Sequence, residues 1–239
     1  MRAAGPAVIF VAALLGAYWT PASALLPQGR LFFPAITRVG GEKNAVALTF
    51  DDGPDPGLDD FLGLLEKYRA RATFFVVGEQ VKRDPSKLRE IVSQGHEVAV
   101  HCHLHRLHLR LTPGQTIEDM RRARAVIEEA SGCTTRFFRP PYGFFNAASW
   151  LEASRQGWKR VLWRRWGRDW EARATPGSVA EEIASPEAGD VLLLHDSDRY
   201  AAPGSLHATL GALPIILERL SSLGLQPRPV GELLDAKGC

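Results

Sequence analysis

The chain has 239 residues and is 45% hydrophobic, which suits one α/β domain with an ordinary core and leaves little room for a second domain. Its 29 basic and 27 acidic residues give a formal net charge of +2, and no sustained basic stripe is present, which argues against a nucleic-acid partner. The sequence also lacks an internal repeat, a low-complexity tract and a long block of like charge.

The N-terminus has the pattern of an export segment. Arg2 precedes an apolar run over residues 7–19, and a small-residue triplet, Ala-Ser-Ala, ends at Ala24. A basic start, a short apolar region and an A-x-A site are typical of a secretory signal peptide, here cleaved after Ala24. We therefore predict that residues 1–24 are a signal peptide or an uncleaved membrane anchor, either of which places the protein outside the cytoplasm. The alternative is a buried N-terminal helix of a cytoplasmic protein.

The rest of the chain divides into a lead-in and one domain. Residues 25–44 are expected to be a lead-in segment without assignable structure, and residues 45–239 to form the domain that carries the candidate site. Three cysteines do not make a disulfide framework. In an exported protein Cys133 and Cys239 could pair, whereas Cys102 is interpreted as a small buried residue and not as a metal ligand.

Seven short runs rich in β-forming residues predict strands. They cover residues 45–50, 72–77, 97–101, 136–138, 159–163, 190–194 and, weakly, 225–228. Segments of helical period lie between them, about six in all. Asp84, Thr112 and Asn146 are the predicted N-caps of three of these helices, and glycines follow their ends.

Strands alternating with helices predict parallel βαβ units. We expect an α/β fold, namely a distorted TIM-like (β/α)7–8 barrel with mostly parallel strands in a single domain. An open doubly wound sheet is the rival, and periodicity does not separate the two. The barrel is favoured because five strand ends carry polar fragments, and such ends meet at one edge of a parallel sheet.

The first two polar fragments contain a candidate metal site. Asp51 and Asp52 follow the first strand; they could form an ordinary surface turn, or one could bind a cation while the other stays free as a base. His101 and His105 are four residues apart, so one helical turn could aim both at a single ion. Two histidines and one carboxylate leave coordination positions open, as catalytic sites do. Zinc is the expected ion, with cobalt, nickel, manganese or iron as alternatives.

The later fragments supply an arginine and an acid. Arg139 precedes Pro-Pro-Tyr-Gly and, if near Asp51, would favour the ionised carboxylate; alone it would be interpreted as a surface arginine. His195 ends an apolar strand and, with Asp169 as its partner, would be an oriented acid. Two other carboxylates, at positions 196 and 198, compete for the role of partner.

Together the ordered fragments TFDDGP, H-x-x-x-H, RPPYG, DW and LLLH resemble the polysaccharide deacetylases of carbohydrate esterase family 4, the NodB-homology domain. The match runs from Ala45 to Leu234, and the co-occurrence of five motifs in order is highly specific. The resemblance implies a distorted (β/α) barrel that removes N-acetyl groups from an amino-sugar polymer, such as peptidoglycan or a chitin-like glycan, and releases acetate.

The resemblance also implies roles on the metal side of the reaction. Asp52, His101 and His105 would bind one divalent metal ion. Asp51 would be the general base, and Arg139 would orient it.

On the leaving-group side, the resemblance makes His195 the general acid, held by Asp169, and the backbone N–H of Tyr142 a donor to the oxyanion. Two positions depart from the family pattern. Cys102 stands where Ser or Thr is usual, which could loosen the histidine loop. Trp166 stands where the fourth motif often has Asp, which puts substrate preference in doubt.

Several alternatives remain open at this point. Trp163, Trp166 and Trp170 could form a sugar-stacking wall, or at least one of them could pack in the core. An acetyl-xylan esterase or a cyclic-amide hydrolase could use the same scaffold, and a non-catalytic carbohydrate-binding protein is the weakest rival. The expected partner is a glycan, and the protein is expected to be a monomer, with membrane attachment through its N-terminal segment if that segment is retained.

Overall fold

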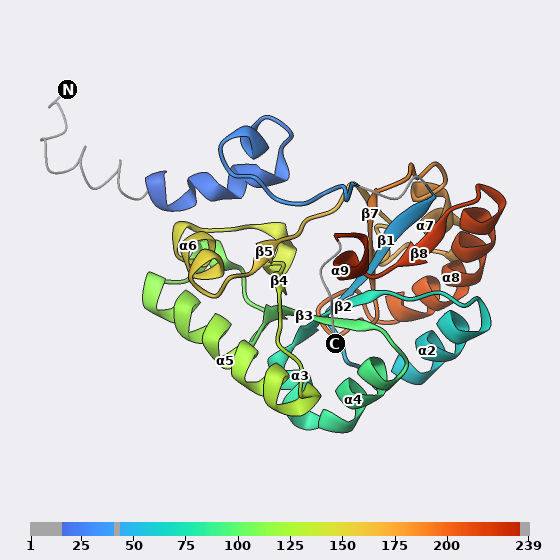
Figure 1. The fold of residues 1–239 in the computed structure, drawn as a ribbon, viewed down its shortest axis with the longest axis horizontal. Helices are drawn as coiled ribbons and strands as arrows, with labels where there is room; N and C mark the ends of the chain where they lie inside the picture. Colours follow the sequence, from blue (N-terminus) through green and yellow to red (C-terminus); the bar gives the residue numbers. More distant parts are fainter. Residues whose placement is uncertain (1–15, 41–43, 235–239) are drawn as a thin grey trace, which may run out of the picture.

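The computed structural model describes residues 16–40 and 44–234 (Figure 1). Eight strands form one sheet in the order β5-β4-β3-β2-β1-β7-β6, with β8 paired to β1. Every pairing between these strands is parallel. The sheet curls into a half-barrel with helices around it, which confirms the predicted barrel-like α/β fold.

The strands are short, and those in the centre of the sheet are buried. Their bounds are β1 Ala45–Asp51, β2 Thr73–Val77, β3 Glu97–Cys102, β4 Phe137–Phe138, β5 Lys159–Arg160, β6 Arg165–Trp166, β7 Val191–His195 and β8 Gln226–Arg228. All residues of β1, β2 and β3 are buried, as expected for parallel strands covered on both faces. β6 is absent from the predicted strands because two residues carry no periodic signal.

All the helices named next except α9 surround the outer face of the sheet (Figure 1). The helices are α2 Leu58–Lys67, α3 Gly78–Arg83, α4 Pro85–Ser93, α5 Pro113–Ser131, α6 Ala147–Arg155, α7 Pro176–Glu182, α8 Ser205–Ser222 and the short α9 Val230–Leu233. The predicted caps of α4, α5 and α6 are confirmed. The side chains of Asp84, Thr112 and Asn146 each accept a hydrogen bond from a backbone N–H in the first turn.

Alternation along the strands separates two cores. In β1, Val46, Leu48 and Phe50 belong to a large apolar cluster that includes the helices. Ala45 and Ala47 point the other way, into a smaller cluster on the inner face of the curl, which α9 also contacts. The inner face is therefore built from every second strand residue, and the residues that end each strand on that face point into the mouth of the half-barrel.

The expectation that residues 25–44 lack assignable structure is wrong for the described part of that segment. A 3₁₀ helix, η2, covers Gly29–Leu31. Farther on, Ile36 forms a parallel bridge with Val161, and Arg38 forms an antiparallel bridge with Asp190. The segment thus lies between the end of β5 and the start of β7 and helps to close the curled sheet. No periodic pattern in the sequence indicates this role, because an isolated bridge involves only one or two residues of the segment.

Residues just before this segment also pack on the domain. The hydroxyl of Tyr18 donates a hydrogen bond to the carbonyl of Leu111 at 2.9 Å, and Ala24, in the 3₁₀ helix η1 (Thr20–Leu25), is fully buried. The export prediction concerns residues 1–24, of which 1–15 lie outside the described residues, so it stays a prediction. Among the helices of the described residues, none has both the length and the apolar character needed to cross a membrane.

Of the cysteines, Cys102 ends β3 and is fully buried with a free thiol, as predicted for a small residue beneath the site. Burial, with nearby acidic groups, raises the pKa of this thiol. Whether Cys133 pairs with Cys239 was left open by the sequence, and Cys239 lies outside the described part of the chain.

Candidate active site

Polar residues at or near the carboxyl ends of the strands line one cavity of about 220 Å³. Its lining combines carboxylates, histidines and aromatic rings. The lining residues are Asp51, Asp52, His101, His105, Tyr142, Gly143, Trp163, Trp166, Trp170, Leu193, His195 and Tyr200. The expectation that fragments from distant parts of the sequence converge at the carboxyl ends of the strands is thus met in the geometry.

The turn after β1 sets two adjacent carboxylates at different angles. Asp51 is the last residue of β1 and points to the inner face, whereas Asp52 has a positive φ of 85°. Short polar side chains tolerate this region better than others do. The backbone of the turn is fixed by β2: Asp52 N–H donates to the Phe75 carbonyl at 3.3 Å, and Val77 N–H donates to the Gly53 carbonyl at 2.8 Å.

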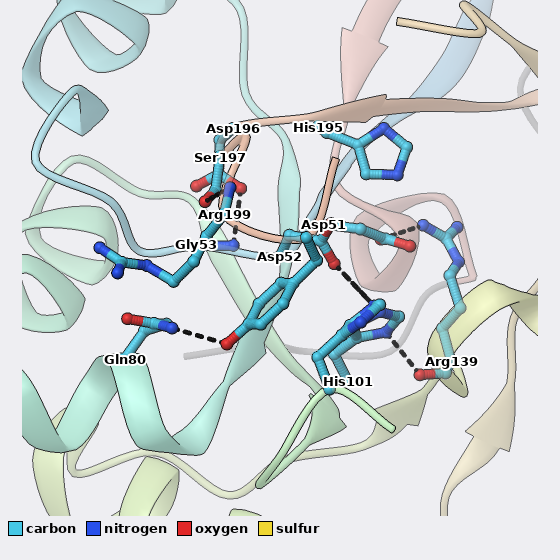
Figure 2. Close-up of polar contacts among 12 residues, drawn as sticks. Asp51, Asp52, Gly53, Gln80, His101, Arg139, His195, Asp196, Ser197 and Arg199 are labelled. Carbon is cyan, nitrogen blue, oxygen red and sulfur yellow. Dashed lines mark hydrogen bonds and ion pairs between the residues drawn. The ribbon is translucent and has the colours of Figure 1, made fainter. Parts of the chain in front are cut away.

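Asp52 faces two histidines. Its Oδ1 lies 3.4 Å from Nε2 of His101 and 3.2 Å from Nε2 of His105. The three side chains offer ligand atoms that all lie within 4.8 Å of one another. In Figure 2 the Asp52 side chain points toward His101, while that of Asp51 points toward Arg139.

The two histidines reach Asp52 by a route other than the expected helical turn. His101 belongs to β3, and His105 lies in the loop that follows this strand. An extended strand places residues four apart far from one another, so the chain must fold back after Cys102. The carboxylate of Asp119 in α5 holds this loop, because it accepts hydrogen bonds from the backbone N–H groups of His103 at 2.8 Å and Leu104 at 3.0 Å.

The donor set fits a divalent cation. Burial opposes ionisation of Asp52, but His101, His105 and His195 outweigh it and lower the pKa of this carboxyl. Its buried Oδ1 has no hydrogen-bond donor among the described residues, although two ring nitrogens face it. A carboxylate oxygen and two imidazole nitrogens, buried and converging, are the ligands expected for a transition-metal ion with open positions.

Arg139 is not a surface residue. Its side chain is fully buried, and its Nη1 lies 2.5 Å from Oδ1 of Asp51. A second N–H group, on Nη2, donates to the Leu162 carbonyl at 3.0 Å, and the guanidinium lies 4.1 Å from the centre of the Phe75 ring. The guanidinium and the carboxylate thus form a buried ion pair whose cation is fixed by contacts on both sides. The arrangement therefore keeps Asp51 in one orientation.

His195 lies beside Asp169, as the sequence suggests. Nδ1 of His195 is 2.9 Å from Oδ1 of Asp169, and its backbone N–H donates to the other carboxylate oxygen at 2.8 Å. Burial lowers the pKa of His195, but the charges of Asp169, Asp52 and Asp51 and the hydrogen bond to Asp169 more than offset this and raise it to about 10. The competing carboxylates are engaged elsewhere: Asp196 accepts from Gly53 N–H at 3.0 Å, and Asp198 accepts from a backbone N–H in its own loop.

Aromatic rings form the walls of the cavity. The Trp163 and Trp166 rings stack with centroids 5.7 Å apart, and the Trp166 and Trp170 rings lie 5.2 Å apart at a tilt. Trp166 is 40% exposed, and Tyr142 is 53% exposed. Tyr142 also has a positive φ of 60° in the 3₁₀ turn η4 (Pro141–Gly143). Trp166 therefore lines the cavity with part of its surface exposed, and core packing does not account for it.

The roles of two residues near the site were not predicted from the sequence. Tyr200, in the loop after β7, stacks its ring on His105 at a centroid distance of 4.3 Å. Asp196 caps the turn that carries Asp52, and it fits there because residue 53 is glycine: a Cβ at that position would collide with the Asp196 carboxylate. The adjacency of Asp196 to His195 is a signal that could have found the second of these, whereas no pattern points to Tyr200.

A curled parallel sheet with a carboxylate and histidine cluster at the carboxyl ends of its strands is the arrangement of a hydrolase that uses a divalent cation. Comparisons with known proteins define the family. Residues 38–161 match the family model described as polysaccharide deacetylase.

Relatives of known name extend over most of the chain. It is 32% identical over 203 residues to a peptidoglycan-N-acetylglucosamine deacetylase of Bacillus cereus, covering 83% of this chain and 92% of that protein. It is also 32% identical over 197 residues to a chitooligosaccharide deacetylase of a Bradyrhizobium species, covering 79% of this chain and 90% of that protein. A family 4 carbohydrate esterase from Streptomyces lividans, solved in complex with acetate, has a TM-score of 0.71 and 32% identity, covering 78% of this chain and 93% of that one. The chain belongs to the polysaccharide deacetylases of carbohydrate esterase family 4.

Proposed function

We propose that the protein is a metal-dependent hydrolase that removes N-acetyl groups from an N-acetylated amino-sugar polymer, peptidoglycan or a chitin-like glycan, and releases acetate. The observation that carries this proposal is the convergence of Asp52, His101 and His105 in one cavity that the Asp51 carboxylate and the His195 imidazole also line. The names of the relatives support N-acetyl glycans as the substrate class.

Asp52, His101 and His105 would hold the cation, proposed to be zinc, which when bound would polarise the acetamide carbonyl and activate a water molecule. Cobalt, nickel, manganese and iron are the alternatives for the same ligands.

Asp51 is the proposed general base. It lies next to the metal-binding set but points toward Arg139, so its carboxylate stays available to accept a proton from the attacking water. Arg139 would orient this carboxylate through the ion pair between its Nη1 and Asp51 Oδ1.

His195 is the proposed general acid. Its pKa of about 10 keeps the imidazole protonated at neutral pH, so it can give a proton to the departing sugar amine while Asp169 stabilises the charged ring. The backbone N–H of Tyr142 would donate to the oxyanion that forms when water adds to the carbonyl. Breakage of the C–N bond then yields acetate and a free amino sugar.

The exposed tryptophan wall supports a sugar polymer as the substrate. Aromatic faces pack against the apolar faces of pyranose rings, and Trp166 offers such a face beside the proposed metal ligands. An Asp at this position would instead offer charge and hydrogen bonds. The substitution therefore favours substrates that are held by stacking.

The test is a panel of acetylated substrates with metal removed and restored. Chitooligosaccharide, peptidoglycan and acetylated xylan are incubated with chelated protein, then with added Zn²⁺, Co²⁺, Ni²⁺, Mn²⁺ or Fe²⁺, and acetate is measured. We expect metal-dependent acetate release from the first two substrates. Release from xylan alone would instead indicate an O-acetyl esterase, an alternative favoured by the esterase name of the Streptomyces lividans relative. Sugar binding without any acetate release would refute the enzymatic proposal.

We also propose that the protein acts outside the cytoplasm as a monomer, carried there by residues 1–24. The packing of Tyr18 and Ala24 on the domain favours retention of this segment as an anchor over its removal.

A further inference from the structure

The two proposed metal-binding histidines are supported in different ways. His101 lies in β3, and its Nδ1 is 2.7 Å from the Arg139 carbonyl, a contact that fixes the ring and its tautomer. His105 lies in a loop, and its Nδ1 is buried without a hydrogen-bond partner in the described part of the chain. The hydrogen bond that normally orients a metal-binding histidine is therefore missing at His105.

At His105, an aromatic ring supports the imidazole by stacking on its face. The Tyr200 ring lies almost parallel to the His105 imidazole, with centroids 4.3 Å apart and 14° between the planes. Tyr142 contacts the same imidazole edge-on at 4.9 Å. A parallel stack of this kind resists rotation of the imidazole out of its plane, and the plane it keeps directs Nε2 toward Asp52 Oδ1, 3.2 Å away.

Tyr200 is itself held by α3. Its hydroxyl donates to Oε1 of Glu79 at 2.7 Å and accepts from Nε2 of Gln80 at 2.6 Å; Figure 2 marks the bond from Gln80. The backbone N–H of Glu79 donates to the His103 carbonyl at 3.0 Å. One turn of α3 thus fixes both the stacking ring and the loop that carries the stacked histidine.

The ends of the Tyr200 loop are also fixed. On one side Ser197 Oγ donates to Asp55 Oδ2 at 2.9 Å, and on the other Ala202 N–H donates to the Trp170 carbonyl at 3.1 Å. The loop therefore bridges the turn after β1 and the aromatic wall, and Tyr200 projects from a backbone anchored to both.

We propose that Tyr200 is a positioning residue that orients His105 for metal binding, with ring stacking in place of a second hydrogen bond. The inference rests on the proposed function, since it requires that His105 binds a metal ion.

The test measures Zn²⁺ affinity of the full chain, made metal-free, by competition with a chromophoric chelator. Tyr200→Leu removes the ring and is expected to weaken Zn²⁺ binding about 10–100-fold, the range seen when the support of a ligand histidine is lost. Tyr200→Phe keeps the ring and loses only the hydroxyl, so its loss is expected to be below about tenfold. The matched control is Tyr68→Leu, which removes a half-buried tyrosine bonded to Glu218, outside the cavity, and should leave the affinity unchanged.

A second readout separates positioning from a general structural role. The Co²⁺-loaded variants are compared by visible absorption, which reports ligand geometry, and the metal-free variants by thermal unfolding. Positioning predicts an altered Co²⁺ spectrum and weaker Zn²⁺ binding in a metal-free protein that is still folded. Tyr200→Met fills the same space with a flexible chain and replaces Tyr200→Leu if the latter does not fold.

Two results overturn the inference alone: unchanged Zn²⁺ affinity in Tyr200→Leu, or an equal loss in Tyr200→Phe and Tyr200→Leu, which would assign the effect to the hydroxyl. If the unsubstituted chain binds none of the metals, the proposed metal site falls and the inference falls with it.

Discussion

Asp51 and Asp52 are neighbours in the chain, and their surroundings separate their roles. Asp51 ends a strand, points to the inner face and pairs with the buried guanidinium of Arg139. Asp52 turns away at a positive φ and faces His101 and His105. A one-residue step along the backbone thus divides two carboxylates between the proposed base and the proposed metal ligand.

This division predicts that Asp51→Asn removes the base and leaves the metal site intact. Activity on chitooligosaccharide should fall by a factor of about 10²–10⁴, the usual contribution of a general base, while bound metal per chain stays at the level of the unsubstituted protein. Acetate release and metal content are measured on the same preparation. In contrast, His101→Ala should lose metal and activity together, and undiminished metal content in that variant would count against the ligand set.

The charge of Asp169 predicts a change in pH dependence. Because Asp169 raises the pKa of His195, Asp169→Asn should lower it, and the protonated acid should then be lost at a lower pH than in the unsubstituted chain. The alkaline limb of the kcat/KM profile is expected to shift to lower pH, with reduced activity at neutral pH. Asp198→Asn is the matched control, since Asp198 lies in the adjoining loop and bonds Gly204 N–H instead. An unshifted limb would remove Asp169 from its proposed role.

Trp166 gives a prediction about substrate length. Trp166→Ala should raise KM for a chitooligosaccharide about tenfold, the equivalent of about 1.4 kcal/mol of lost stacking, and leave hydrolysis of a small acetyl ester unchanged. Steady-state kinetics on both substrates checks this. Equal effects on the two substrates would show that the ring supports the site and does not bind sugar.

At the scale of elements, the site depends on segments that only the fold brings together. By simple alternation, β1 and β7 deliver their last residues, Asp51 and His195, to the inner face, and β3 delivers His101, the residue before its last. The loops do the rest: α5 holds the loop of His105, α3 holds the Tyr200 ring, and the turn after β7 caps the turn after β1. Loss of one such support should disturb a ligand without unfolding the sheet.

The start of α6 predicts a large cost for one capping residue. Asn146 Oδ1 accepts from Ser149 N–H, and its Nδ2 lies 2.7 Å from the Tyr18 hydroxyl and 2.6 Å from the His108 carbonyl. Asn146→Ala should therefore lower the free energy of unfolding by about 3 kcal/mol, for a lost cap and buried groups left unpaired. Thr175→Ala, which removes the exposed cap of α7, should cost only about 1 kcal/mol. Urea unfolding of both variants tests the difference, and equal losses would contradict it.

At the scale of the whole molecule, the segment before β1 belongs to the folded structure. It bridges the sheet at Ile36 and Arg38, and farther upstream Ala24 is buried and Tyr18 bonds to Leu111 and Asn146. A chain cut after Ala24 would lose the second set of contacts and keep the first.

This packing predicts that the mature protein retains residues 18–24. Mass spectrometry of the N-terminal peptide, on protein isolated from its native membrane and soluble fractions, measures the start of the mature chain. We also expect a version starting at Leu25 to unfold at a lower temperature than one starting at Gly16, because it lacks Tyr18 and its two hydrogen bonds. A native chain that starts at Leu25 would instead support a cleaved signal peptide.

The central strands, the caps of α4, α5 and α6, and the family were all accessible from the sequence, because they rest on local patterns and on five motifs in order. The two-residue strand β6 and the bridges at Ile36 and Arg38 were not accessible from the sequence, since one or two paired residues are too few to show an alternating pattern. The position of His105 also required the structure. Spacing by four suggests a helical turn, but β3 extends through Cys102 and a loop brings the second histidine back.

By itself, the sequence determined which side chains are the candidates for the proposed chemistry, because the ends of parallel strands meet at one edge of a sheet and the residue types at those ends can be read from the sequence. Only the tertiary structure decided what holds them: the buried Arg139 against Asp51, the Tyr200 ring against His105 and Asp196 under the turn of Asp52. These contacts join residues far apart in the chain through their side chains, and local periodicity carries no information about such pairs.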